Sequence, residues 1–442
     1  MNEKKVFNLW SIVYGLWFDS MDKFIIHKSS LKGTVKISGS KNASLPIMAA
    51  TLLTDEECVI KNVPDLMDIR TMIKILEVLG KEIKFQRNVL IVKAKKRTSG
   101  KEYVAPYKLV RTMRASFCCL GPLLAKRKKA SVAFPGGCVI GVRPVDLHLK
   151  GLRELGASIV VEKGYCVATT KGLIGKHIYL GGAFGSSVLA TANIVMAAVL
   201  ARGVTLIEHA ACEPEIESLV FVLKKMGAQV EGQGTPLIKV LGVKVLGGVT
   251  VEIIPDRIEA GTFIAASLAT NSPLCIEDIN PWHLTSVIET ARGMGAQCVV
   301  GESSISVNPG GAMKSVNLTT LPYPGFPTDL QAQFMVCLCL AEGISLITEK
   351  IYPDRFMHVA EINRMGACVR RNGPYSIIEG RDKLYGAEVM ASDLRASAAL
   401  VIAALAAQGK TQVLRVYHID RGYDKIEDKL RKLGAKIKRV KQ

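Results

Sequence analysis

A short phrase recurs six times along this chain of 442 residues: Leu or Met, then Gly, then Ala or Lys. Its glycines lie about 70 residues apart, at Gly80, Gly156, Gly227, Gly295, Gly366 and Gly434. Each phrase ends an amphipathic helical pattern and precedes a β-type run, such as residues 158–161. Glycine suits the end of a helix because it adopts the left-handed conformation without a Cβ clash. The sequence therefore predicts six repeats that each finish as helix, turn and strand.

A second glycine lies about half a repeat earlier in each unit, for example Gly203, Gly343 and Gly409. The helix before it is rich in Ala and apolar on nearly all faces, which is typical of a buried helix. Six units are too many for one core, because single cores stop growing near ~250–300 residues. We therefore expect two similar α/β domains of three repeats each, with the ligand site in the cleft between them.

The first twenty residues differ from the rest. Lys4 and Lys5 precede an apolar stretch that holds Trp10, Tyr14 and Trp17, without the small residues of a signal-peptide cleavage site. An interfacial membrane anchor is one interpretation. The interpretation we prefer is a start outside the core fold, with the domain beginning at Met21.

Composition narrows the class of partner. Lys and Arg total 58 against 39 Asp and Glu, a formal charge of +19 that favours an anionic partner. No apolar run is long enough to span a bilayer. The eleven cysteines have no zinc-type spacing and mostly lie in apolar runs, as Cys337 and Cys339 do. We expect a cytoplasmic protein with no metal and no cofactor.

The segment from Phe134 to His148 is the most unusual in the sequence. Cys138 follows Gly136 and Gly137, and Arg143 comes five residues later. Exposure and a neighbouring positive charge lower the pKa of a thiol and make it a nucleophile or proton donor. For this loop alone, a reactive thiol and an ordinary turn with a spectator cysteine are equally good interpretations.

Basic residues also recur at turns and helix starts. Lys41, Arg114, Arg395 and Arg421 are placed where side chains and helix N-termini bind phosphate or carboxylate groups, although each alone is typical of a solvated surface. Asp329 stands at the mouth of an apolar helix. It is either an N-cap or, if a substrate hydroxyl lies within reach, a general base.

These motifs together resemble the UDP-N-acetylglucosamine enolpyruvyl transferases. The resemblance runs from about Met21 to the C-terminus and is carried by residues 38–42, 110–116, 135–148, 213–216, 255–259, 326–333, 355–359, 393–397 and 417–423. It implies two pseudo-symmetric, inside-out α/β domains, each of three βαβ-containing units. Residues 42–254 would form one domain, and residues 21–41 with 255–442 the other.

The resemblance also implies an activity and its residues. Enolpyruvyl would pass from phosphoenolpyruvate to the 3′-hydroxyl of UDP-N-acetylglucosamine by addition and elimination, in the first committed step of peptidoglycan synthesis. Cys138 would be the proton donor that fosfomycin alkylates, and Asp329 would accept the sugar hydroxyl proton. Lys41, Arg143 and Arg421 would hold phosphoenolpyruvate. Arg114 and Arg395 would bind substrate near that cradle. The sugar nucleotide would meet Asn42 and the stretch Arg143, Pro144, Val145, Asp146 and Leu147, and the further substrate-binding residues would be Ser187, Val188 and Ile351.

One loop departs from the family pattern. Residues 181–191 are about two residues longer than the compact family loop that touches the uridine and diphosphate, and Leu189 replaces its usual glycine. This departure keeps a catalytically weakened sugar-nucleotide-binding paralogue as an alternative. A shikimate-pathway enolpyruvyl transferase is a second alternative, disfavoured by Cys138. An RNA-binding role is suggested only by the net charge, so we expect no nucleic-acid partner. We expect a monomeric enzyme that acts on small molecules.

Overall fold

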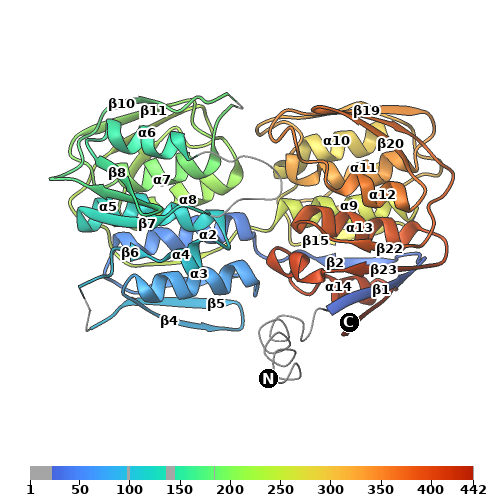
Figure 1. Cartoon of the computed structure of the whole chain (residues 1–442), viewed down its shortest axis with the longest axis horizontal. Helices are drawn as coiled ribbons and strands as arrows, with labels where there is room; N and C mark the ends of the chain where they lie inside the picture. The colour runs from blue at the N-terminus through green and yellow to red at the C-terminus, as the bar shows by residue number, and fades with distance from the viewer. Residues whose placement is uncertain (1–21, 97–99, 136–144, 184, 442) are drawn as a thin grey trace, which may run out of the picture.

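The computed structural model describes residues 22–96, 100–135, 145–183 and 185–441. Its buried apolar side chains form two separate clusters. One comprises residues between Ala43 and Ile253, and we call this part of the chain the first half. The other joins Phe24–Ile37 to residues between Ile258 and Ile437, and we call this part the second half. Figure 1 shows two lobes side by side, and the division at residues 41–42 and 254–255 stays a prediction.

Each half contains three four-stranded sheets with one shared plan. In every sheet an edge strand runs parallel to its neighbour, and the remaining strands pair antiparallel. In the first half the sheets are β14(Val249–Glu252)-β3(Cys58–Lys61)-β5(Val89–Ala94)-β4(Lys81–Gln86), β6(Val104–Ala105)-β7(Lys129–Ala133)-β9(Tyr165–Thr169)-β8(Ser158–Glu162) and β10(His177–Tyr179)-β11(Val204–Glu208)-β13(Leu237–Leu241)-β12(Gln229–Glu231).

The second half repeats the plan but borrows strands from the start of the chain. Its sheets are β2(Gly33–Lys36)-β15(Leu274–Glu277)-β17(Ser304–Asn308)-β16(Gln297–Val300), β18(Leu318–Thr320)-β19(Ile344–Glu349)-β21(Tyr375–Glu379)-β20(Cys368–Asn372) and β22(Glu388–Met390)-β23(Lys410–Leu414)-β1(Asp22–His27)-β24(Lys436–Lys441). Strand β1 therefore lies between two of the last strands of the chain.

The helices divide into an inner and an outer set. The inner helices are buried on nearly all sides: α2(Lys41–Ala50), α5(Leu120–Arg127), α7(Val188–Ala198), α9(Arg257–Ala269), α11(Gln331–Cys339) and α13(Leu394–Ala406). The amphipathic helices are α3(Met67–Val78), α6(Asp146–Glu154), α8(Pro214–Lys225), α10(Thr285–Gly293), α12(His358–Arg364) and α14(Ile426–Lys432). Short helical turns are α4(Tyr107–Val110), η1(Thr51–Leu53), η2(Arg114–Cys119), η3(Pro281–Leu284), η4(Thr328–Leu330) and η5(Val416–Arg421).

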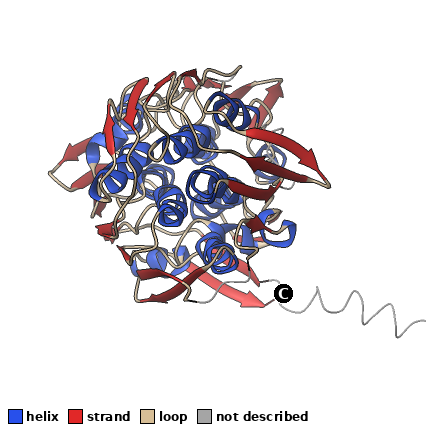
Figure 2. Cartoon of the chain, turned by 90° about the vertical axis from the view of Figure 1, so that its left-hand side faces the viewer, coloured by secondary structure: helices blue, strands red, loops and turns tan. Residues whose placement is uncertain are grey.

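The sheets surround the inner helices, as Figure 2 shows by the helices at the middle and strands at the perimeter. Strand residues alternate accordingly, with buried side chains facing the helices and exposed ones facing out, as in β13 and β21. The predicted inside-out α/β fold is confirmed. No helix in the described part of the chain is long and apolar enough to cross a membrane.

The predicted helix-ending glycines are also confirmed. All six that define the repeat have positive φ, from 91° at Gly366 to 105° at Gly227. Each follows an amphipathic helix and precedes a strand, for example α6, Gly156 and β8. Ten cysteines fall within the described ranges, all free, and seven of them are buried.

Candidate active site

Charged side chains from both halves meet where α2 begins. Ser40 caps this helix, since its hydroxyl accepts the N–H of Ala43 at 3.2 Å. Lys41, the first helical residue, is buried, and its Nζ lies 3.3 Å from Oδ2 of Asp68 in α3. Arg421, at the end of η5 in the second half, donates from Nε to Oδ1 of the same carboxylate at 3.0 Å. Asp68 of the first half thus holds together two predicted cations, Lys41 at the start of α2 and Arg421 of the second half.

Burial acts on the lysine of this pair. It lowers the pKa of the Lys41 ammonium, and the Asp68 carboxylate offsets part of that shift. Arg395 and Asp329 also act on Lys41 electrostatically. The groups at the start of α2 therefore belong to the same electrostatic environment as the second cluster, around Asp329.

Asp329 lies between two arginines of the second half. Its Oδ1 accepts from Nη1 of Arg355 at 2.8 Å, and its Oδ2 accepts from Nη2 of Arg395 at 3.0 Å. From the first half, Nδ2 of Asn42 donates to Oδ2 at 3.4 Å. Neither Asp329 nor Thr328 caps a helix, since η4 begins after Pro327 without a side-chain cap. The N-cap interpretation of Asp329 is wrong.

The arginines determine the charge of Asp329. Burial alone would raise the pKa of this carboxyl, but Arg395 and Arg355 together hold it well below its usual range. The carboxylate is therefore ionised and already engaged in this state of the protein.

Arg395 retains unused donors in a buried position. Arg395 is 2% exposed, and its guanidinium carbon lies 5.4 Å from the ring centroid of Tyr423. Its Nη2 is bound to Asp329, whereas its Nε and Nη1 have no hydrogen-bond partner in the described structure. A buried charged donor without an acceptor is costly, so these two groups are suited to an anionic ligand.

Predicted sugar-nucleotide residues lie on both sides of this cluster. Ile351 is placed by Glu349, whose Oε1 accepts the Ile351 N–H at 2.9 Å and whose Oε2 accepts the Thr328 hydroxyl at 3.0 Å. In the first half, Val145, Asp146 and Leu147 form the start of α6. Cys138, Arg143 and Pro144 lie outside the described residues.

Arg114 opens η2 near the same end of α6. Together with burial, which is the larger cause, it lowers the pKa of His148 to about 3, so this imidazole is neutral. Nδ1 of His148 lies 2.9 Å from Nδ2 of Asn193, which also donates to the carbonyl of Phe117. This network attaches the start of α6 to α7.

The unusual loop at residues 181–191 reaches towards both halves. Gly182 and Gly185 exchange backbone hydrogen bonds of 3.1 Å, which makes a tight turn. A Cβ on Gly182 would lie 3.1 Å from Leu147, and one on Gly185 would lie 3.3 Å from Pro322 of the second half. The hydroxyl of Ser187 accepts the N–H of Ala190, so Ser187 caps α7 and Val188 begins it.

Further contacts join the halves outside this centre. Arg257 of α9 makes two hydrogen bonds, of 2.9 and 3.2 Å, to the buried carboxylate of Glu215 in α8.

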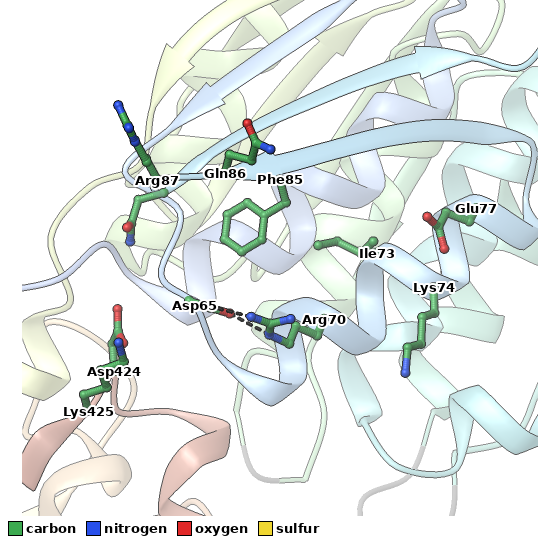
Figure 3. A pocket seen from close by; sticks show the side chains of 11 residues that line it. Asp65, Arg70, Ile73, Lys74, Glu77, Phe85, Gln86, Arg87, Asp424 and Lys425 are labelled. Carbon is green, nitrogen blue, oxygen red and sulfur yellow. Dashed lines mark hydrogen bonds and ion pairs between the residues drawn. The ribbon is translucent and has the colours of Figure 1, made fainter.

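A cavity of about 540 Å³ lies between α3, the β4–β5 hairpin and Asp424–Lys425 (Figure 3). Its lining includes the Asp65–Arg70 ion pair but none of the predicted site residues. Within the described ranges, no three His, Cys, Asp or Glu side chains are grouped to hold a metal ion.

The structure thus brings Lys41, Asn42, Asp329, Arg395 and Arg421 together. The sequence interpretation assigned no role to Asp68 or Arg355. An acid in the first turn of a helix usually only complements the helix dipole, so Asp68 carried no signal of its own. Arg355 lay in a motif of the family resemblance, which was the one available indication.

Known proteins match this chain over nearly its whole length. The family model for EPSP synthase (3-phosphoshikimate 1-carboxyvinyltransferase) matches residues 25–430. A UDP-N-acetylglucosamine 1-carboxyvinyltransferase of Methylacidiphilum infernorum is 50% identical over 421 residues, covering 95% of this chain and 99% of that protein. The UDP-N-acetylglucosamine 1-carboxyvinyltransferase 2 of Carboxydothermus hydrogenoformans is 50% identical over 423 residues, covering 95% and 100%.

Solved structures agree on the fold. The enolpyruvyl transferase NikO from Streptomyces tendae superposes with a TM-score of 0.85 at 23% identity, covering 96% of this chain and all of that one. EPSP synthase from Acinetobacter baumannii gives a TM-score of 0.73 at 20% identity, covering 95% and 100%. With about half of the residues identical to proteins of one name over 95% of its length, the chain belongs to the UDP-N-acetylglucosamine 1-carboxyvinyltransferase family, within the enolpyruvyl transferase fold.

Proposed function

We propose that this chain transfers the enolpyruvyl group of phosphoenolpyruvate to the 3′-hydroxyl of UDP-N-acetylglucosamine and releases phosphate, in the first committed step of peptidoglycan synthesis. The observation that carries the proposal is the convergence of Lys41, Arg421, Arg395 and Asp329 between the two halves, in a chain about half identical to enzymes of that name. Both substrates are polyanions, so several cations are needed to offset their repulsion.

In the addition step, the carboxylate of Asp329 accepts the proton of the sugar hydroxyl. The hydroxyl oxygen then forms a bond to C2 of phosphoenolpyruvate, while the Cys138 thiol protonates the C3 methylene. In the elimination step, C3 returns a proton to the Cys138 thiolate, the bond from C2 to the phosphate oxygen breaks, and the proton held by Asp329 leaves with the phosphate. Atoms balance, since phosphate and the enolpyruvyl ether are the only products. Lys41, Arg143 and Arg421 hold the phosphoenolpyruvate.

The ion pairs around Asp329 fit a base that is switched on by substrate. Arg395 and Arg355 hold the pKa of Asp329 low, which makes the carboxylate a weak base. Phosphate and diphosphate oxygens compete for Arg395, whose Nε and Nη1 are already unpaired. Drawing Arg395 away from Asp329 raises the pKa of the carboxyl, so the base strengthens when its substrate is present.

For the sugar nucleotide we propose contacts with Asn42 and residues 145–147, with Ser187 and Val188 at the start of α7, and with Ile351, whereas Arg114 and Arg395 lie near the phosphoenolpyruvate. The Ser187 hydroxyl accepts the Ala190 N–H as a helix cap and keeps its own O–H free to donate to a ligand. We also propose that the enzyme is monomeric and cytoplasmic, and that fosfomycin alkylates Cys138.

The test is phosphate release from phosphoenolpyruvate by the purified chain, with UDP-N-acetylglucosamine or shikimate 3-phosphate as acceptor. We expect release with the sugar nucleotide alone. Release with shikimate 3-phosphate would assign the chain to the other pathway. Release with neither, together with retained binding of the sugar nucleotide, would identify the weakened paralogue and direct attention to residues 181–191.

A further inference from the structure

The last sheet of the fold, β22-β23-β1-β24, has an outer face unlike the others. Its inward side chains, such as Phe24, Ile26 and Ile437, are buried against the core. By strand alternation the outward positions of β23, β1 and β24 include three lysines and a histidine: Lys410, His27, Lys436 and Lys438. We call these four residues, with Lys23 beside them on β1, the basic face.

Three of these side chains stand in one row across adjacent strands. His27 pairs in register with Lys410 on one side and with Lys436 on the other. Two lysines therefore stand on either side of His27, and no carboxylate in this row compensates their positive charge. A bound anion would compensate the positive charge of the two lysines.

The nearby carboxylates are engaged elsewhere. Arg439, on the inner side of β24, pairs with Asp22, Asp420 and Glu427. Lys410, Lys436 and Lys438 make no ion pair with any described residue. The one carboxylate among the outward positions is Glu388, on edge strand β22 opposite Gln412.

Outer faces of other sheets place opposite charges in register. Glu82 stands opposite Lys93, Glu252 opposite Lys61, and Glu231 opposite Lys239. The chain has 58 cationic and 39 anionic side chains, and its surplus of positive charge is thus not spread evenly over the surface. The basic face holds a share of that surplus that neighbouring carboxylates do not compensate.

Apolar side chains lie among the lysines. Ile25 stands between Gln412 and Lys438, and Val440 stands opposite Lys23. Met390, 40% exposed, and Leu414 extend this apolar part onto β22 and β23. None of the outward positions of the sheet carries Phe, Tyr or Trp, the residues on which nucleic-acid bases stack.

We propose that this face docks on a membrane surface rich in anionic phospholipid. Lysine ammonium groups reach the phosphate headgroups while their methylene stems and the apolar residues enter the boundary with the acyl chains. The same strand β1 continues directly from the segment with Lys4, Lys5, Trp10 and Trp17, whose composition suits the same interface.

The experiment is co-sedimentation of the full chain with vesicles of phosphatidylglycerol mixed with phosphatidylcholine, compared with vesicles of phosphatidylcholine alone. We expect binding to the first, weakened by salt, and none to the second. In the triple variant Lys410→Gln/Lys436→Gln/Lys438→Gln the affinity should fall about a hundredfold, since each lysine near an anionic surface contributes about fivefold. Phosphate release in solution should be unchanged, which checks that the variant is folded.

The matched control is Lys171→Gln/Lys176→Gln/Lys244→Gln, which removes the same charge from exposed lysines of the first half. It should bind vesicles almost as the unaltered chain does. Equal loss in both triple variants would overturn the proposal in favour of net charge. So would tight binding of duplex DNA, lost in the first triple variant, without vesicle binding. A chain starting at Met21 should still bind the anionic vesicles, and complete loss there would assign the membrane contact to residues 1–20 instead.

Discussion

Asp329 receives hydrogen bonds from Arg355 and Arg395, which belong to different repeats, and from Asn42 of the other half. A lone acid at a helix start could not be distinguished from a cap in the sequence. The structure distinguishes them because the carboxylate accepts from side chains and from no backbone N–H of η4. Its neighbours make it an ionised group whose basicity depends on what else binds the arginines.

Replacing Asp329 tests this dependence. Asp329→Asn keeps the shape of the side chain but removes the proton acceptor, so turnover should fall by about 10²–10⁴ while the KM for the sugar nucleotide changes little. Steady-state phosphate release measures both quantities. Asp278→Asn, which breaks only an exposed ion pair with Lys36, is the control and should leave turnover intact. Normal turnover in the Asp329 variant would remove it from the mechanism.

Cys138 is the second residue-scale prediction. Cys138→Ser should abolish covalent labelling by fosfomycin and sharply lower turnover, because a hydroxyl is a far weaker acid than a thiol. Mass spectrometry of the intact, drug-treated protein detects the adduct. Cys212→Ser and Cys368→Ser, which change two partly exposed thiols, are the controls and should be labelled as before. An adduct that persists in Cys138→Ser places the reactive thiol elsewhere.

At this scale the sequence predicted the cations and the acid but not their partners. Lys41, Arg395 and Arg421 stood out as basic residues at turns and helix starts. Asp68 did not, although it binds both Lys41 and Arg421, the latter 353 residues further along the chain. Such contacts depend on tertiary packing, and no local pattern encodes them.

Among the elements, the repeat was the most predictable feature. Each unit carries its own signals, an all-apolar inner helix and a glycine after the amphipathic helix, so six units could be recognised without knowing how they pack. The order of strands in each sheet was not predictable, because the edge strand that pairs in parallel comes from a different position along the chain in different sheets. In the first half, β14 at its end completes the sheet of β3, the first strand of that half.

The glycine turns can be tested at Gly156, which has a φ of 92° and where an added Cβ would meet no heavy atom within 4 Å beyond its chain neighbours. Gly156→Ala should therefore lower the free energy of unfolding by about 1–2 kcal/mol through backbone strain alone. Gly156→Asn should lose less, since Asn tolerates the left-handed region. Urea denaturation of the two variants measures the difference. Equal losses would contradict a conformational origin.

For the molecule as a whole, the halves are joined by buried charges rather than by a continuous apolar core. Glu215 and Arg257 pair across the halves, and Glu215 is 2% exposed. This pair lies outside the proposed active site and couples one half to the other.

A double-variant cycle measures that coupling. Arg257→Met leaves the Glu215 carboxylate buried without its partner and should cost about 3 kcal/mol of stability, and Glu215→Met should cost a similar amount for the opposite reason. The double variant should cost clearly less than the sum, because neither charge is then left alone. Denaturant unfolding gives all three values. Strict additivity would mean that the pair does not join the halves energetically.

Strand β1 pairs along its whole length with β24, from Asp22 opposite Lys441 to His27 opposite Lys436. During synthesis on the ribosome, β1 emerges first and its partner strand emerges last. The intervening first half has all its own strands and can close while the chain is still growing. The half that is begun before the other is therefore completed after it, and β1 must wait, unpaired on that side, until β24 has been translated.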